Sequence, residues 1–220
     1  MSSAASPPPA GRPAGPPAEA ANYLGPISAT PHYVVSAMLH LAKANANTVV
    51  FDLGCSDGRV PIAAARDHGV KSAVGYEISE VAYARSIAAL ASCDEDVRKH
   101  VTLIHGDAFE ADLRQADVVF LYLLPRGLRK LEQKLNRELK PGTRIVTYLF
   151  QLPPSLGKWA AQPRQVVGVT NPAKKNVVDT SDVSKLYLYE VDGGHAQAKR
   201  RSALLVMMAA LAAAAVFRLR

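Results

Sequence analysis

Apolar residues along the chain alternate between short β-rich runs and longer stretches with helical spacing. The β-rich runs lie at 48–53, 72–77, 101–104, 116–121 and 144–150. Helical spacing is found at 60–68, 80–92 and 127–139. Strands that alternate with helices in this way predict a parallel sheet with right-handed crossovers and helices on both faces.

The segments on either side of this repeat complete the predicted fold. Thr30-Pro31 precedes an apolar pattern at helical spacing, with a threonine able to cap a helix and a proline suited to its first turn. Residues 165–170 and 185–191 have β character with no helix between them, which favours an antiparallel pair. We therefore predict a Rossmann-like, doubly wound α/β fold whose mostly parallel, seven-stranded sheet has an antiparallel edge strand.

The composition divides the chain into four parts. Residues 1–26 form a Pro- and Ala-rich tail that cannot bury enough apolar surface to order itself. We expect one folded domain at 27–193 and a basic linker at 194–202. The last part is an apolar segment at 203–217.

The segment 203–217 is apolar throughout and has basic residues on both sides. At ~1.5 Å per residue a helix of this length spans about 22 Å, short of the ~30 Å hydrocarbon core. Snorkelling arginines and local bilayer thinning can cover part of that gap. A C-terminal apolar helix that acts as a transmembrane tail anchor is the leading interpretation. A helix docked on the domain or lying in the interface is the alternative, but this segment has no polar face to present to water.

The formal charge of +7 is concentrated at the C-terminus. Five of these charges come from Lys199, Arg200, Arg201, Arg218 and Arg220, and no acidic residue lies at 195–220. The rest of the chain carries only about +2, which argues against a nucleic-acid partner. The cysteines, Cys55 and Cys93, are not in a zinc-binding pattern, and we expect a reducing compartment and no metal.

A glycine-containing loop follows the first predicted strand. It reads Asp52-Leu-Gly54-Cys-Ser56-Asp-Gly58, and its position between strand and helix is where open α/β sheets bind ligands. Glycine allows a tight turn and a close approach of the ligand. The two glycines are four residues apart, unlike the dinucleotide pattern GxGxxG, and no basic residue inside the loop meets a pyrophosphate. A sulfonium cofactor fits this loop better than NAD.

An acidic residue ends the second predicted strand. Glu77 lies 23 residues after Gly54, close to the separation at which such folds present a carboxylate to ribose hydroxyls. A carboxylate accepts two hydroxyl hydrogen bonds in a way that few neutral side chains can. Glu77 is therefore a candidate ribose ligand.

The loop resembles motif I of the seven-strand S-adenosylmethionine methyltransferases, acidic-x-Gly-x-Gly-x-Gly, although Ser56 stands where the middle glycine is expected. After the third strand, residues 105–109 resemble the adenine site of that family. The resemblance implies S-adenosyl-L-methionine as the cofactor. It assigns cofactor binding to Asp52, Gly54, Ser56, Gly58, Glu77, Asp107 and Ala108.

The fourth predicted strand leads into Tyr122-Leu-Leu124-Pro125, where amino-directed relatives carry their acceptor-orienting loop. With residues 29–35 and 131–153, this stretch resembles the membrane-tethered mitochondrial lysine methyltransferases that modify ATP synthase subunit c and the adenine nucleotide translocase. That resemblance implies a protein lysine acceptor at or near a membrane, with Tyr122, Leu124 and Pro125 as the acceptor-orienting residues, and favours a mitochondrial location. Those enzymes carry their membrane segment before the catalytic domain, whereas here the apolar segment follows it.

Two other functions fit the same residues. A small-molecule or lipid methyltransferase would use the same cofactor pocket, and an anchor would place it beside a hydrophobic acceptor. A catalytically idle methyltransferase fold that serves as a membrane-tethered binding module is consistent with Ser56 in the glycine loop.

Overall fold

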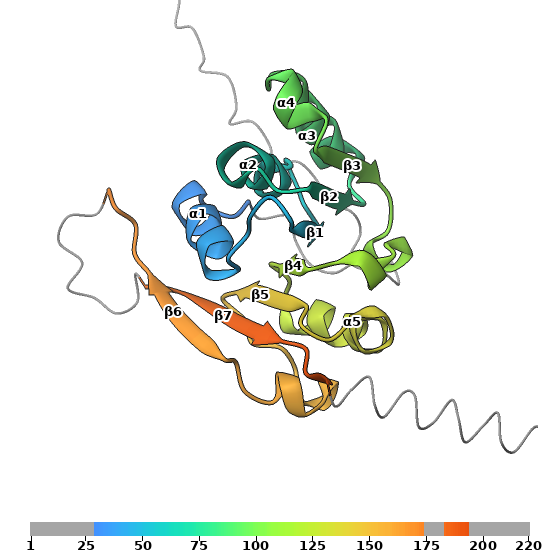
Figure 1. Cartoon of the computed structure of the whole chain (residues 1–220), viewed down its shortest axis with the longest axis vertical. Coiled ribbons are helices and arrows are strands. Elements are labelled where there is room, and N and C mark those ends of the chain that lie inside the picture. The colour runs from blue at the N-terminus through green and yellow to red at the C-terminus, as the bar shows by residue number, and fades with distance from the viewer. Residues whose placement is uncertain (1–28, 174–182, 194–220) are drawn as a thin grey trace, which may run out of the picture.

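The computed structural model describes residues 29–173 and 183–193, which contain one seven-stranded mixed sheet (Figure 1). Its strands are β1 (Val49–Leu53), β2 (Ser72–Glu77), β3 (Val101–His105), β4 (Val118–Leu121), β5 (Arg144–Tyr148), β6 (Gln165–Val169) and β7 (Ser184–Glu190). The spatial order is β3-β2-β1-β4-β5-β7-β6. The first five strands are parallel, and β7 runs antiparallel to both of its neighbours. The predicted mixed sheet with an antiparallel pair at one edge is confirmed.

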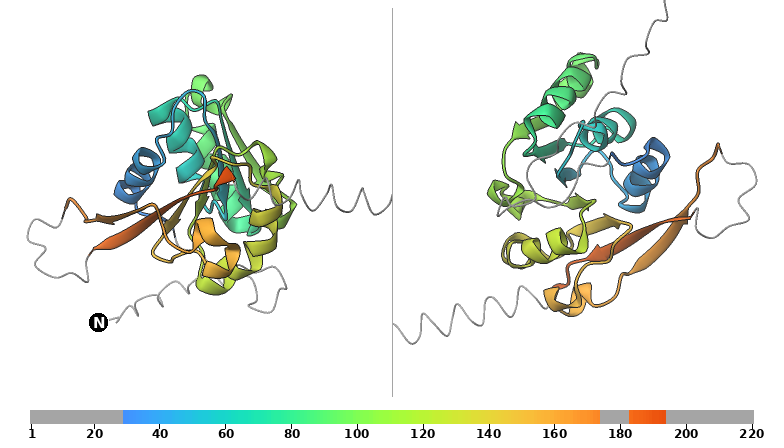
Figure 2. Two further views of the ribbon diagram at one scale, coloured as in Figure 1. Left: turned by 60° about the horizontal axis from the view of Figure 1, so that its bottom comes forward. Right: turned by 180° about the vertical axis from the view of Figure 1, so that it is seen from behind.

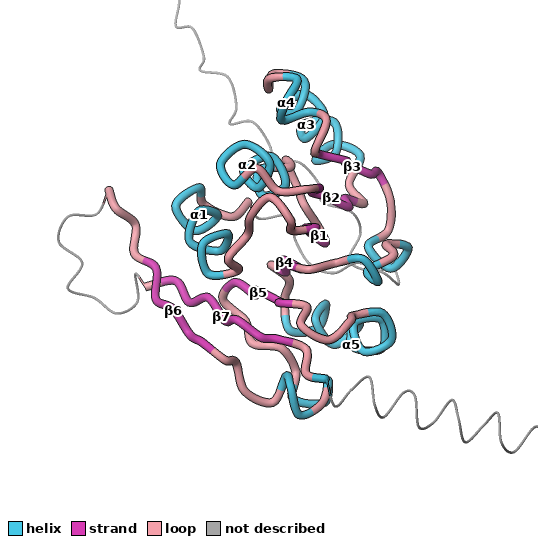
Figure 3. The backbone as a smooth tube through the Cα atoms, viewed as in Figure 1, coloured by secondary structure: helices cyan, strands magenta, loops and turns pink. Residues whose placement is uncertain are grey.

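Helices cover both faces of the sheet (Figure 3). They are α1 (His32–Leu41), α2 (Arg59–His68), α3 (Glu80–Ala91), α4 (Glu95–Arg98) and α5 (Pro125–Glu138). Short 3-10 turns lie at Ala108–Glu110, Leu113–Gln115, Pro154–Leu156 and Lys158–Ala160. The helix α4 and these turns were not predicted, because segments of three or four residues carry no measurable apolar period.

The apolar core forms two clusters, one on each face of the sheet. Val34 and Met38 of α1 pack with Val60 of α2 and with alternate strand residues such as Phe120. On the other face, Leu128, Leu131 and Leu135 of α5 pack against the remaining strand residues. The strands β1, β4 and β5 are almost wholly buried because helices cover both of their faces, as expected for central parallel strands.

The helix α1 begins one residue later than the sequence suggested, and it does so without a capping side chain. Its N-cap is Pro31, whose carbonyl accepts hydrogen bonds from Val34 and Val35. Thr30 does not cap the helix, so that prediction was wrong. Thr30 is buried instead, and its carbonyl accepts a hydrogen bond from the Arg59 side chain of α2.

The last two strands continue past the end of β5 as a two-stranded ribbon (Figure 2). Leu186 is the first β7 residue that pairs with β5, whereas Ser184 and Lys185 pair with β6 alone. The ribbon therefore begins beside Tyr148, at the edge where the parallel strands end.

The predicted tail at 1–26, basic linker at 194–202 and apolar helix at 203–217 lie outside the described residues. Across 29–173 and 183–193, no helix is both long enough and apolar enough to cross a membrane. The membrane anchor thus stays a prediction from the sequence.

Candidate cofactor and acceptor site

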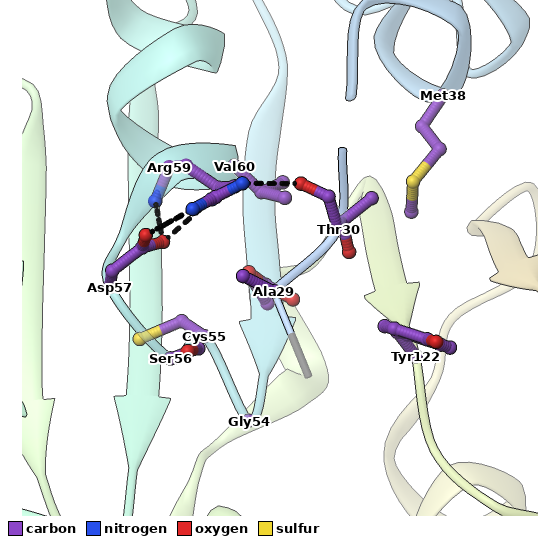
Figure 4. Close-up of a pocket in the computed structure, with 11 residues that line it drawn as sticks. Ala29, Thr30, Met38, Gly54, Cys55, Ser56, Asp57, Arg59, Val60 and Tyr122 are labelled. Carbon is purple, nitrogen blue, oxygen red and sulfur yellow. Dashed lines mark hydrogen bonds and ion pairs between the residues drawn. The ribbon is translucent and has the colours of Figure 1, made fainter. Parts of the chain in front are cut away.

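A pocket lies at the carboxyl ends of β1 and β4, where the strand order reverses direction (Figure 4). Open α/β sheets bind ligands at such switch points. About 330 Å³ of empty space, including the opening to solvent, is lined by Ala29, Thr30, Met38, Asp52, Gly54, Cys55, Ser56, Asp57, Arg59, Val60 and Tyr122.

The loop after β1 turns tightly because three of its residues have positive φ. The φ angles are 88° at Gly54, 51° at Ser56 and 75° at Gly58. The amides of Gly54 and Cys55 both donate to the carbonyl of Tyr76 at 2.9 Å, which ties the loop to β2. Ser56 thus has the backbone conformation for which the family motif uses glycine, and a side chain there is strained.

Gly58 supports the pocket from behind. It is buried at the start of α2, and a Cβ there would lie 3.0 Å from the Cβ of Ser86 on α3. Gly58 does not line the pocket. Its requirement for glycine comes from the left-handed backbone and from close packing between helices.

Glu77 links the glycine loop to the start of α3. Its Oε2 accepts the Ser56 amide at 2.8 Å, and its Oε1 accepts the Ser79 amide at 2.8 Å. The side chain is only 5% exposed. Because each carboxylate oxygen has two lone pairs, each can accept one further hydrogen bond from a ligand hydroxyl.

Asp52 places a buried carboxyl group in the pocket. It is 6% exposed, and none of the described residues donates a hydrogen bond to its side chain. Burial, together with the nearby charges of Glu77 and Asp57, raises its pKa from 3.8 to about 7. A cationic ligand would stabilise the ionised form of this buried carboxyl group.

Arg59 joins the glycine loop to the segment before α1. Its Nε donates to Asp57 Oδ1 at 2.8 Å, and its Nη1 donates to the carbonyl of Thr30 at 2.8 Å (Figure 4). The hydrogen bond from Arg59 is the largest cause of the lowered pKa of Asp57. This link holds Ala29 and Thr30 as one wall of the pocket.

A second group of predicted residues lies beside the pocket, at the ends of β2 and β3. Glu77 pairs with His105 in the parallel register, and the Gly106 amide donates to the Glu77 carbonyl at 3.0 Å. Asp107 follows and accepts the amide of Phe109 at 2.9 Å. Ile78 is 44% exposed at this edge, although it is a large apolar residue. Glu77, Ile78 and Asp107 form a surface that is partly polar and partly apolar, here called the ledge, on the side of the site toward β3.

The predicted acceptor loop lies at the opposite side. Tyr122 follows β4 and lines the pocket, whereas Leu124 and Pro125 are exposed at the start of α5 and do not line it. The structure thus brings Asp52, Gly54, Ser56 and Tyr122 together around one cavity. Glu77, Asp107 and Ala108 lie outside its lining.

Sequence reasoning missed the contributions of α1 and of the residues before it. Ala29, Thr30 and Met38 line the pocket, and Arg59 holds Thr30 in place. The stretch 29–35 was noted for its resemblance, but its place in the pocket depends on a contact across 29 residues of sequence.

Comparison with known proteins decides the family. The family model described as "ANTKMT methyltransferase domain" matches residues 52–160. A protein-lysine N-methyltransferase from Saccharolobus islandicus is 42% identical over 128 residues, which are 58% of this chain and 78% of that protein. The chain belongs to the ANTKMT methyltransferase family.

Two further relatives are similar over different shares of their length. The adenine nucleotide translocase lysine N-methyltransferase of Mus musculus is 37% identical over 136 residues, 61% of this chain and 54% of that protein, so this chain spans about half of it. The crystal structure of an RNA methyltransferase from Salinibacter ruber, in complex with S-adenosyl-L-homocysteine, is 35% identical with a TM-score of 0.61. It covers 76% of this chain and 95% of its own.

S-adenosylmethionine is the cofactor of this methyltransferase, and the pocket fits it chemically. The cofactor carries positive charge on its sulfur and on its amino group, and the buried Asp52 carboxyl group lacks a donor among the described residues. The ledge formed by Glu77, Ile78 and Asp107 offers acceptors and an apolar surface of the kind that a ribose and an adenine ring need. The donor set is therefore consistent with this cofactor.

Cys55 does not act as a nucleophile in this site. It is buried and packs against Gly75, where a Cβ would lie 2.7 Å from its sulfur. Burial raises the pKa of its thiol, so the thiolate is not formed at neutral pH. Its small size is what the loop uses.

Proposed function

We propose that this methyltransferase transfers a methyl group to the side-chain amine of a protein lysine. The observation that carries this proposal is the similarity to the Saccharolobus islandicus protein named a protein-lysine N-methyltransferase, which is 42% identical over 78% of that protein's length. The mouse relative, whose name states that it acts on lysine in the adenine nucleotide translocase, supports the same acceptor class.

The chemistry of the pocket fits an amine acceptor. When bound, S-adenosylmethionine would supply an electrophilic methyl group to the neutral amine, whose lone pair would form the carbon–nitrogen bond as the carbon–sulfur bond breaks and leaves its electrons on sulfur. The lysine ammonium would first lose a proton to water, and the methylated nitrogen would carry the positive charge. A neutral amine needs alignment and desolvation rather than a strong base, and no histidine or lysine is among the pocket-lining residues that the structure describes.

Every predicted site residue except Gly58, which supports the loop by packing against α3, has a proposed role at the cofactor or the acceptor. The Asp52 carboxylate interacts with the positively charged end of the cofactor, and Gly54 and Ser56 bring the loop backbone close to it. Glu77 binds the ribose hydroxyls, while Asp107 and Ala108 contact the adenine. Tyr122 orients the acceptor amine, and Leu124 and Pro125 form the mouth of the acceptor side.

RNA is the second candidate acceptor, because the Salinibacter relative is named an RNA methyltransferase and is 35% identical. The charge distribution argues against it, since the chain outside 195–220 carries only about +2. Lipids and small molecules are further candidates, and a catalytically idle binding module is the alternative in which no methyl group is transferred.

We further propose that the chain acts at a membrane, with a mitochondrial membrane favoured. The support is the apolar sequence 203–217 between basic residues, and the mouse relative whose name refers to the adenine nucleotide translocase. The full chain should fractionate with membranes, whereas a chain that ends at Gln197 should not. Equal distribution of both chains would contradict the anchor.

The acceptor class is tested by methyl transfer from isotopically labelled S-adenosylmethionine to matched cell fractions. We expect label in a membrane-protein fraction, and background counts in total RNA and in a lipid extract. The control is Glu77→Ala, which should lose the label. Label in RNA or lipid alone would overturn the lysine proposal. Cofactor binding by calorimetry with no transfer to any fraction would instead favour the idle module.

A further inference from the structure

The carboxyl end of β5 presents a second tyrosine behind the predicted acceptor residue. Leu121 of β4 pairs with Thr147 of β5 in the parallel register, so Tyr122 and Tyr148 follow side by side. Their ring centroids are 4.5 Å apart at an interplanar angle of 54°. Tyr122 lines the pocket, whereas Tyr148 does not line it and is only 5% exposed.

Tyr148 is fixed from the far side by the last strand. Its hydroxyl lies 3.0 Å from the hydroxyl of Ser184, the first residue of β7. Burial raises the pKa of Tyr148, and Tyr122 and Tyr33 contribute to the same shift, so the phenol stays neutral and keeps this hydrogen bond. The Tyr148 ring thus has contacts on two sides that determine its orientation.

The turn after Tyr148 has a strained backbone. Leu149 has a φ of 65°, and the Phe150 amide donates to the Tyr148 carbonyl at 2.9 Å, which closes a rare γ-turn around Leu149. The turn is held by hydrogen bonds from the Leu149 amide to the Lys185 carbonyl and from the Thr147 hydroxyl to the Phe150 carbonyl. A leucine with positive φ is an outlier, and such outliers gather at functional sites.

The strained turn leaves an apolar side chain in solvent. Leu149 is 38% exposed and Leu124, after β4, is 42% exposed. Both residues follow the carboxyl ends of neighbouring strands, on the edge of the sheet where the pocket lies. Folding alone does not explain why a leucine occupies a position that glycine would occupy without strain.

We propose that the end of β5 forms the second half of the acceptor site, in which Tyr148 is a positioning residue that fixes the Tyr122 ring and Leu149 contacts the acceptor. The inference rests on the proposed lysine acceptor. The methylene stem of a lysine lies against the Tyr122 ring, which Tyr148 and Ser184 hold in place. The Leu149 side chain contacts the methylene stem of that lysine, or an apolar residue of the acceptor protein next to it, at the mouth of the pocket.

The test uses a binding probe that does not depend on methyl transfer. The probe is n-butylamine, which reproduces the methylene stem and the amine of lysine. It is titrated into the full chain in the presence of S-adenosylhomocysteine. The NMR signals of ring-labelled tyrosines report where it binds. We expect the Tyr122 signal to shift in the wild type. Tyr148→Leu should weaken butylamine binding at least 10-fold, with S-adenosylhomocysteine affinity within 3-fold of wild type. Tyr148→Phe keeps the ring against Tyr122 but loses the hydrogen bond to Ser184, so it should weaken butylamine binding less than Tyr148→Leu does, by about 3-fold.

Tyr189→Phe is the matched control. Tyr189 is as deeply buried and its hydroxyl accepts the Leu152 amide at 3.1 Å, but it packs in the cluster on the other face of the sheet. It should lower thermal stability without changing butylamine binding. A Tyr122 signal that does not respond, or a Tyr148→Leu variant that binds the amine as the wild type does, would overturn the inference.

Leu149→Gly keeps the inference testable if Tyr148→Leu does not fold. Glycine adopts the positive φ without strain, so the variant should be at least as stable as the wild type and yet bind butylamine at least 5-fold more weakly. Greater stability with unchanged amine binding would show that Leu149 contacts no acceptor. Failure of methyl transfer in a protein that binds butylamine at Tyr122 would contradict the proposed function and leave this site intact.

Discussion

The amide of Ser56 donates to the carboxylate of Glu77 at 2.8 Å, which joins the glycine loop after β1 to the end of β2. Glu77 therefore holds the loop in shape, and it also belongs to the ledge that we propose for the adenosine part of the cofactor. Because the second oxygen accepts the Ser79 amide, the carboxylate satisfies two backbone donors at once.

Glu77→Gln should weaken S-adenosylmethionine binding by about 10- to 100-fold. The glutamine amide has one acceptor oxygen, whereas the carboxylate uses both of its oxygens as acceptors. A charge-assisted hydrogen bond contributes ~1.5–3 kcal/mol, which corresponds to that loss of affinity. Titration calorimetry measures the loss. Glu80→Gln, exposed in the first turn of α3, is the control and should bind as the wild type does. Unchanged affinity in Glu77→Gln would remove Glu77 from the cofactor site.

Asp52 makes stability without cofactor depend on pH. Its pKa in the folded chain is about 7, above the ordinary 3.8, so the folded state binds more protons than the unfolded state between these values. Stability should therefore fall as pH rises from about 4 to 7. Asp52→Asn should flatten that dependence and be more stable than the wild type at pH 8, as thermal melts at several pH values would show.

The same carboxyl group predicts how cofactor affinity varies with pH. A cationic ligand binds the ionised form of Asp52, so affinity for S-adenosylmethionine should increase between pH 5.5 and 7.5, with a proton released at the lower pH. Calorimetry in buffers of different ionisation enthalpy measures that proton. If affinity were equal at the two pH values, or if Asp52→Asn kept the dependence, Asp52 would not face the charged end of the cofactor.

Ser56→Gly should stabilise the chain and preserve cofactor binding. Ser56 has a φ of 51°, and glycine relieves that conformation by up to ~1 kcal/mol, which corresponds to a rise in Tm of roughly 2–4 °C. Ser36→Gly, exposed on α1 in a helical conformation, is the opposite control and should lose about 0.5 kcal/mol. A Ser56→Gly variant with lower Tm and weaker binding would show that the serine hydroxyl contributes to the site.

Arg59→Lys should lower kcat/KM about 10-fold. Lysine keeps the charge but cannot contact both Asp57 and the Thr30 carbonyl as the guanidinium does, so the wall formed by Ala29 and Thr30 is no longer held. Arg66→Lys is the control, because its exposed pair with Asp67 contributes little. Steady-state kinetics that left both variants equal to the wild type would show that the Thr30 contact does not shape the site.

The fold was accessible from the sequence because its elements are long and strongly patterned. The alternation of apolar strands and helices predicted the parallel sheet, and the absence of a helix between 165–170 and 185–191 predicted the antiparallel pair. Asp52, Gly54 and Glu77 could be singled out as candidates because each stands at or next to the carboxyl end of a predicted strand. The pattern of apolar residues could not predict contacts between residues that are distant in the sequence.

Thr30 shows the limit most clearly. Its local sequence suggests a helix cap, yet its carbonyl binds Arg59 and its side chain is buried at the pocket. The same holds for Tyr148. Its position in the alternating pattern of β5 indicates only a core residue, whereas its contact with Tyr122 depends on the register between β4 and β5. The positive φ of Leu149 could not be predicted from the sequence, because leucine rarely adopts a positive φ.

Amino-acid analysis of the methylated product tests the central claim most directly. The full chain is incubated with labelled S-adenosylmethionine and a membrane-protein fraction, the protein is hydrolysed, and the labelled amino acid is identified by mass. The account predicts that the label is in N-methylated lysine and is absent with Glu77→Ala. Label in any other amino acid, or a folded and cofactor-binding wild type that labels RNA and no lysine, would contradict it.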